Sequence, residues 1–258
     1  MATNDHDTIS EDAFMECMRN FIAPDPSPRN PRIGTQSSLA DRIEAGYRVD
    51  GHSTWGFVIY RTTYESEVDW AEFMHRLRWW TKDAMEFCNG RDVLDRMAWT
   101  VFDDREQFNG MPVATIRDHF HAWTETAPQT EQDNKADGSS AVMGQSQRYR
   151  YCVLVDAESL KSAVHDTPPP PGFDYDKQEW VKVIDRKWLP RSENPIFAGR
   201  KPEPNVYQPI EGVAEEHIGW VKCPLPSVMT EYYVLLRDLN GYMISYRRPP
   251  AVTGYPWR

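Results

Sequence analysis

The chain has 258 residues, 40% of them hydrophobic, and its 39 acidic and 29 basic side chains give a formal net charge of -10. This length is sufficient to bury a full hydrophobic core without a metal or disulfide framework. The acidic balance excludes a protein that coats nucleic acid, because nonspecific affinity comes from basic side chains that neutralise phosphates, but it leaves room for a local basic patch.

Four cysteines are widely separated along the chain, without a C-x-x-C pair or a histidine at zinc-finger spacing. This spacing favours neither a metal site nor a disulfide framework. The longest apolar run, residues 55–60, is far too short to cross a bilayer, and residues 1–30 are polar and acidic, unlike a secretory signal. We therefore expect a cytoplasmic protein with reduced thiols, no metal and no membrane partner.

The N-terminal region, residues 1–54, is expected to contain one helix and a proline-rich loop. Apolar side chains at helical spacing follow Ser10, whose hydroxyl can cap the first turn, and they predict a helix over residues 10–22. Prolines then recur at positions 24, 26, 28 and 31, where they remove backbone donors and disfavour helical angles in the preceding residue. This pattern predicts a loop over residues 23–54.

A β-α-β-α module is predicted over residues 55–127. The aromatic and β-branched run that begins at Trp55 is too short for a helix, and the apolar residues after the capping Ser66 keep a 3.6-residue period. The predicted elements are a strand over residues 55–60, a helix from Ser66 to Asn89-Gly90, a strand over 97–102 and a helix over 112–123.

A second α/β module is predicted over residues 148–258, after a polar segment. Residues 128–147 are mostly polar, lack periodicity and cannot bury enough apolar area to offset chain entropy, which is typical of a mobile loop. The predicted elements beyond it are strands over residues 148–155, 179–185, 217–222 and 242–246, a helix over 156–164 and a helix from Ser227 to Leu239. Alternating strands and helices indicate an α+β or α/β fold, built either as one mixed sheet or as two split β-α-β modules packed side by side.

The first candidate site is the acidic cluster Asp103, Asp104 and Glu106, which follows a predicted buried strand where α/β proteins often bind ligands. Crowded carboxylates can raise one another's pKa, so that one of them serves as a general acid or base, and they can also hold a cationic substrate. An exposed acidic turn that leads into a helix is the structural alternative.

The second candidate is the corner Arg61, Thr62, Thr63 and Tyr64, which leaves the first predicted strand. A guanidinium beside two hydroxyls and a phenol can bind a carboxylate, a phosphate or a developing oxyanion. Hydroxyl groups at strand ends also commonly satisfy neighbouring backbone groups, so that both interpretations remain open.

The histidines offer weaker candidates. His119 and His121 are two residues apart on a predicted helix, so their side chains diverge and cannot share a metal ion. His217 follows two glutamates and could act as a base that a carboxylate orients, although a loop histidine is more often simply solvated.

Basic side chains lie along the first long helix of the first module. Arg76, Arg78 and Lys82 surround Trp79, and interleaved basic and aromatic residues can follow a phosphate backbone and stack on unpaired bases. Charged helix faces are usually only solvated, which is the alternative interpretation. The chain has no dinucleotide-binding, P-loop, zincin or nucleophile-elbow motif, so the corresponding chemistries are disfavoured.

A resemblance to known proteins rests on a few sequence segments. They are Trp55-Gly-Phe-Val-Ile-Tyr-Arg-Thr-Thr-Tyr64 with Trp70 and Phe73, then Asp104-Arg105, Phe120 with Trp123, and the closing Tyr246-Arg-Arg-Pro-Pro250. Over residues 55–250 the chain resembles a large set of intracellular proteins of filamentous fungi, among them the arginine-containing cyclodipeptide synthases. The acidic D-D-x-x-E motif of that family has its nearest match at Asp103-Asp104-Arg105-Glu106, with Gln107 where the motif has glutamate.

The resemblance implies an enzyme of secondary metabolism that condenses arginyl-tRNA with a second aminoacyl-tRNA to a cyclic dipeptide and needs no cofactor. Asp103, Asp104 and Glu106 would be catalytic, the Arg61 corner and His217 would bind substrate, and Arg76, Arg78 and Lys82 would contact tRNA, with no role for DNA. Two alternatives remain open, a tailoring enzyme or cyclase for a small metabolite, and a non-catalytic interaction protein.

Overall fold

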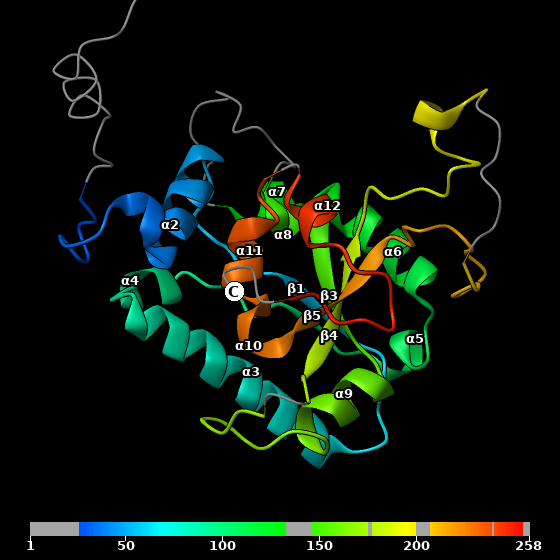
Figure 1. The fold of residues 1–258 in the computed structure, drawn as a ribbon, viewed down its shortest axis with the longest axis horizontal. Coiled ribbons are helices and arrows are strands. Elements are labelled where there is room, and N and C mark those ends of the chain that lie inside the picture. Colours follow the sequence, from blue (N-terminus) through cyan, green and yellow to red (C-terminus); the bar gives the residue numbers. More distant parts are fainter. Residues whose placement is uncertain (1–25, 133–145, 175–176, 200–206, 239, 255–258) are drawn as a thin grey trace, which may run out of the picture.

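Five strands form one mixed sheet in the computed structural model, which describes residues 26–132, 146–174, 177–199, 207–238 and 240–254 (Figure 1). The strands are β1 (Val58–Arg61), β2 (Val101–Phe102), β3 (Tyr151–Val155), β4 (Trp180–Asp185) and β5 (Trp220–Pro224). The strand order is β2-β1-β3-β4-β5, with β1 parallel to β2 and β3 and the other two pairings antiparallel. The single mixed sheet is thus the alternative observed, and both predicted modules contribute strands to it.

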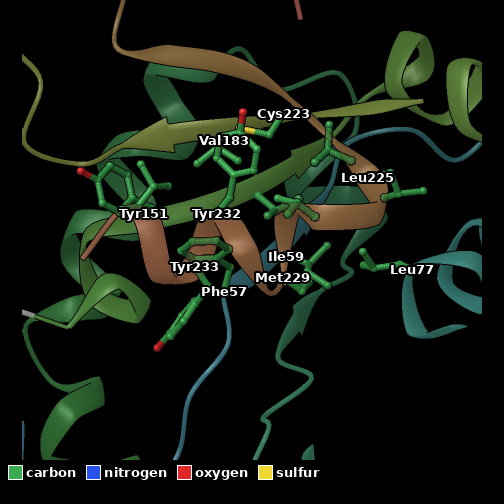
Figure 2. Packing of buried hydrophobic residues seen from close by; sticks show 14 of the residues in the cluster. Phe57, Ile59, Leu77, Tyr151, Val183, Cys223, Leu225, Met229, Tyr232 and Tyr233 are labelled. Atoms are coloured by element: carbon green, nitrogen blue, oxygen red, sulfur yellow. The ribbon is translucent and has the colours of Figure 1, made fainter. Parts of the chain in front are cut away.

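Helices cover both faces of the sheet, which explains why its central strands are apolar on both sides. On one face Phe57, Ile59 and Val183 pack against Leu77, Met229 and other core residues of the covering helices (Figure 2). These helices are α2 (Leu39–Val49), α3 (Glu67–Phe87), α9 (Ala157–Val164), α10 (Leu225–Val228) and α11 (Glu231–Leu235). On the other face Val58 and Tyr60 pack against α5 (Arg105–Phe108) and α6 (Val113–Thr124).

Short helices complete the described part of the chain. They are the α-helices α4 (Arg91–Leu94), α7 (Ala127–Glu131), α8 (Gln147–Arg150) and α12 (Gly241–Ser245), and the 3-10 helices η1 (Thr35–Ser37) and η2 (Pro195–Phe197). Within the described ranges, none of the helices is long and apolar enough to cross a membrane.

The best-predicted elements are those with a local capping signal. Ser66 accepts a hydrogen bond from the backbone N–H of Asp69 and begins α3, and Asp156 accepts from the N–H of Ser159 and begins α9. The predicted helix over residues 112–123 corresponds to α6. The predicted helix over residues 10–22 lies outside the described residues.

The loop predicted over residues 23–54 is wrong in part, because α2 lies within it. Ser38 caps this helix by accepting from the N–H of Asp41, and Ile43 and Tyr47 bury its apolar side. The prolines responsible for the loop prediction all precede residue 32, so they do not interrupt this later amphipathic segment.

Three other predictions are corrected by the structure. Residues 148–150 belong to α8 and not to the strand, and residues 128–131 to α7 and not to the loop. The strand predicted over 242–246 is the helix α12, whose Tyr242 ring stacks on Tyr151 at 5.9 Å between centroids. Short apolar runs of this kind fit strand or helix, and the packing partner decides between them.

The helix predicted from Ser227 is interrupted at Thr230, which has non-helical φ and ψ values of -123° and -82°. α10 contacts α3, whereas α11 contacts α2, and the break lets each half pack against a different partner. β5, the last strand of the sheet, begins at Trp220, whereas the sequence predicted a start at residue 217.

A close approach of α2 to the end of α3 requires glycine at position 90. A methyl group added at Gly90 would overlap the Cβ of Ala40. We expect Gly90→Ala to lower the free energy of unfolding by about 1–3 kcal/mol, because the two buried segments must separate. Urea denaturation measures the change. Gly254→Ala is the control, since a methyl group there meets no atom within 4 Å, and equal stability of the two variants would contradict the packing described.

Candidate functional site

The carboxyl ends of β1 and β2 lie side by side, and they bring together two candidate clusters that are far apart in sequence. Tyr60 is paired with Phe102 in the parallel ladder, so the next residues, Arg61 and Asp103, are also neighbours. Nη1 of Arg61 lies 3.3 Å from each carboxylate oxygen of Asp103. We call the group Arg61, Tyr64, Glu67 and Asp103 the β1–β2 edge.

Arg61 is buried, and each nitrogen of its guanidinium donates a hydrogen bond within the protein. Nη1 and Nη2 donate to the two carboxylate oxygens of Glu67 at 2.9 and 2.7 Å, and Nε donates to the carbonyl of Thr63 at 2.9 Å. The rings of Tyr64 and Trp70 lie 4.4 and 4.9 Å from the guanidinium carbon. Burial opposes the charge, but Glu67 and Asp103 outweigh it and raise the pKa of Arg61.

The neighbouring donors are also engaged within the protein. The Tyr64 hydroxyl donates to the carbonyl of Arg61 at 3.0 Å, and the Thr62 hydroxyl donates to the carbonyl of Val155 at 3.2 Å. Burial, followed by the charge of Asp103, raises the pKa of Tyr64 to about 12. These hydrogen bonds fix the end of β1 in place. They also occupy the donors of Arg61, Thr62 and Tyr64, which are therefore poorly placed to stabilise a substrate oxyanion.

The acidic cluster divides into residues with different environments. The side chain of Asp103 is 38% exposed although it contacts the buried Arg61. Asp104 caps α5 by accepting from the N–H groups of Glu106 and Gln107 at 2.9 and 3.2 Å, and Glu106 points into solvent on the first turn. Asp103 is thus the member of the cluster that is both fixed in position and open to a ligand.

The charge around this edge is predominantly negative. Glu67, Asp103, Asp104 and Glu106 contribute four carboxylates, and Arg61 and Arg105 are the nearby bases. The Arg61 contact lowers the pKa of Glu67, which keeps that carboxylate ionised. Such an arrangement favours a cationic ligand.

His217 is not part of this site. β5 is antiparallel to β4, which is antiparallel to β3, and β3 is parallel to β1. The start of β5 is therefore at the same edge of the sheet as the start of β1, whereas Arg61 is at the end of β1. His217 precedes β5 and packs on the Tyr246 ring at 4.2 Å, where burial lowers its pKa.

The three basic residues predicted on the long helix have different roles. Arg76 is buried, and its Nη1 donates to the carbonyls of Ala163 and Thr167 at 2.6 and 3.0 Å, at the end of α9. It connects two helices and does not face solvent. Arg78 and Lys82 are exposed, with Arg78 near the Trp99 ring and Lys82 3.6 Å from Glu86.

A tyrosine–histidine pair next to the β1–β2 edge was not predicted. The Tyr60 hydroxyl lies 2.8 Å from Nδ1 of His119, and the rings of Phe102 and Phe108 are each 5.1 Å from the imidazole. Burial raises the pKa of Tyr60 and lowers that of His119, which favours the neutral form of both groups. Strand alternation places Tyr60 on the α6 face and could have indicated this contact.

His121 lies on the exposed side of α6, 4.0 Å from Glu125, so the two histidines diverge as predicted. In the part of the chain that the structure describes, no group of three or more histidine, cysteine, aspartate or glutamate residues is placed to hold a metal ion. Glu67 was also missed, although it begins α3 directly after Ser66, because the sequence does not show that the helix start faces Arg61.

No protein-family model, no curated protein and no solved structure matches the chain.

Proposed function

We propose that the protein is an enzyme that acts on a cationic aminoacyl substrate at the β1–β2 edge, as a cyclodipeptide synthase that joins arginyl-tRNA and a second aminoacyl-tRNA. The observation that carries the proposal is the Asp103 carboxylate, which is open to solvent and is held in place by a buried arginine of the neighbouring strand. The excess of carboxylates over bases around it favours a substrate with a guanidinium or ammonium group.

The chemistry needs little beyond positioning, because an aminoacyl ester is already activated. The α-amine of one aminoacyl group attacks the ester carbonyl of the other, an amide forms, and the 3′ oxygen of one tRNA leaves as a hydroxyl. The free amine of the resulting dipeptidyl ester attacks its own ester, which closes the ring and releases the second tRNA. Asp103 can accept the proton that each attacking amine loses. The remaining rate acceleration comes from holding the amine and the ester carbonyl in reacting positions.

Contacts to tRNA phosphate would fall to Arg78 and Lys82, because Arg76 is buried against α9. Lys82 lies 3.6 Å from Glu86 on α3, so we expect weak and salt-sensitive RNA binding. Replacing both with glutamine should weaken tRNA binding without changing stability, which a filter-binding titration at two salt concentrations measures.

The test of the proposal is product formation. The purified protein is incubated with arginyl-tRNA and a mixture of other aminoacyl-tRNAs, and arginine-containing cyclic dipeptides are measured by mass spectrometry. We expect Asp103→Asn to reduce product at least about a hundredfold, because the proton acceptor is lost, while the thermal midpoint stays nearly unchanged at this partly exposed position.

Asp95→Asn is the matched control, an exposed aspartate at the end of α4. Full product formation by Asp103→Asn would remove Asp103 from the mechanism. Unchanged aminoacyl-tRNA and no cyclic dipeptide with the unaltered protein would overturn the synthase proposal and favour the tailoring enzyme or the interaction protein.

A further inference from the structure

A cavity of about 460 Å³ is lined by residues of the second half of α3, of α10, of the start of α11 and of the segment that follows α9. Its lining residues are Trp80, Asp83, Ala84, Glu86, Phe87, Phe173, Pro226, Ser227 and Glu231. Glu67 of the β1–β2 edge is at the first residue of α3, thirteen residues before Trp80. At 1.5 Å per residue this separation is about 20 Å, so the cavity is a different site.

The lining combines aromatic rings with negative charge. Trp80, Phe87 and Phe173 provide the rings, and Phe87 is 90% exposed. Three of the nine lining residues are acidic and none is basic. The cavity is within the range of about 300–1,000 Å³ that small-molecule sites occupy.

Glu231 is the half-buried carboxylate of this cavity. Two other sheltered carboxylates have a basic partner, Asp50 with Arg237 at 2.7 Å and Asp156 with Lys182 at 2.9 Å. Glu231 accepts from the Thr230 hydroxyl, and among the described residues no arginine, lysine or histidine forms an ion pair with it. A half-buried carboxylate without a counter-charge costs free energy that a cationic ligand can recover.

We propose that this cavity binds a small organic cation, an ammonium or guanidinium group on an apolar stem. The stem lies against the rings of Trp80 and Phe173, and the cationic head pairs with Glu231, while Asp83 and Glu86 attract it from the rim. Aromatic faces and carboxylates both favour a cation, and together they select it over a neutral ligand of the same shape. This proposal does not depend on the β1–β2 edge.

Calorimetric titration with three matched probes tests the charge preference: phenethylammonium, 2-phenylethanol and phenylacetate. Ligands of about nine non-hydrogen atoms bind with dissociation constants near or below the millimolar range in a formed pocket. We expect phenethylammonium to bind about tenfold more tightly than 2-phenylethanol, and phenylacetate to show no saturation. Equal binding of the ammonium and the alcohol would overturn the proposal, and so would a lack of saturable ammonium binding.

Variants locate the site. Glu231→Gln should weaken phenethylammonium binding about tenfold and leave 2-phenylethanol unchanged, and Asp83→Asn, at the rim, should weaken it less. Asp95→Asn is the control outside the cavity. Unchanged ammonium affinity in both cavity variants, with folding verified by circular dichroism, would refute the assignment. Asp103→Asn should bind the probe normally while it loses product formation, so the two proposals can fail separately.

Discussion

Replacement of Arg148 by methionine is expected to lower the free energy of unfolding by about 3 kcal/mol or more. Arg148 is 0% exposed, and its guanidinium donates to both carboxylate oxygens of Glu131 at 2.9 and 2.7 Å. It also donates to the carbonyl of Gly56 and the hydroxyl of Thr100, each at 2.7 Å. One side chain thus connects α7, α8 and the segments that lead into β1 and β2. Its removal leaves the carbonyl of the buried Gly56 without this donor and the half-buried Glu131 carboxylate without its counter-charge.

Urea denaturation of the purified variant measures this loss. The double variant Arg148→Met with Glu131→Gln should recover part of it, because the uncompensated carboxylate is then absent. Arg78→Met, at an exposed position of α3, should change stability by less than about 0.5 kcal/mol. A loss below about 1 kcal/mol for Arg148→Met would show that the connections around this guanidinium do not support the fold as described.

Glu179→Gln should stabilise the protein at pH 8 and not at pH 4. Glu179 is buried next to β4, and burial raises its pKa from 4.5 to about 7, with Arg76 and Trp80 offsetting part of the shift. Because the pKa is raised, the folded state still binds a proton between about pH 4.5 and 7, a range in which the unfolded state has already released it. The associated stability is fully present below about pH 4.5 and is lost as the pH rises through 7.

The shift from 4.5 to about 7 corresponds to about 3 kcal/mol, and we expect glutamine, which carries no charge, to recover about 2 kcal/mol of it at pH 8. Urea midpoints of the two proteins between pH 4 and pH 8 measure the difference. Glu106→Gln, at an exposed position, is the control for a general loss of negative charge. A stability difference that stays constant across this range would contradict the burial of an ionisable Glu179.

Local signals account for the elements that were predicted correctly. The caps at Ser66 and Asp156 and the periodic apolar side chains of α3 and α6 act within a few residues, so they can be read along the chain. β1, β3 and β4 are buried on both faces, and their short apolar runs are also visible in the sequence. α12 and the break at Thr230 depend on which partner each segment contacts, and no local pattern contains that information.

The candidate site shows the same division. The sequence placed Arg61 and Asp103 each at the end of a strand, and this local information was sufficient to propose both. Their contact follows from the parallel pairing of β1 with β2, which is a long-range property of the chain. Glu67 lies only six residues after Arg61, but the sequence does not show that the first turn of α3 faces Arg61.

Residue type and spacing could not distinguish buried from exposed charges. Arg76 and Arg78 are two residues apart on one helix, yet the first is covered by the end of α9 and the second faces solvent. His217 was grouped with substrate-binding residues by its acidic neighbours, and the direction of β5 places it at the other edge of the sheet. Composition and capping therefore determined the elements and the residue types that could react, whereas strand direction and helix packing decided which of them meet, because those contacts join residues far apart in the chain.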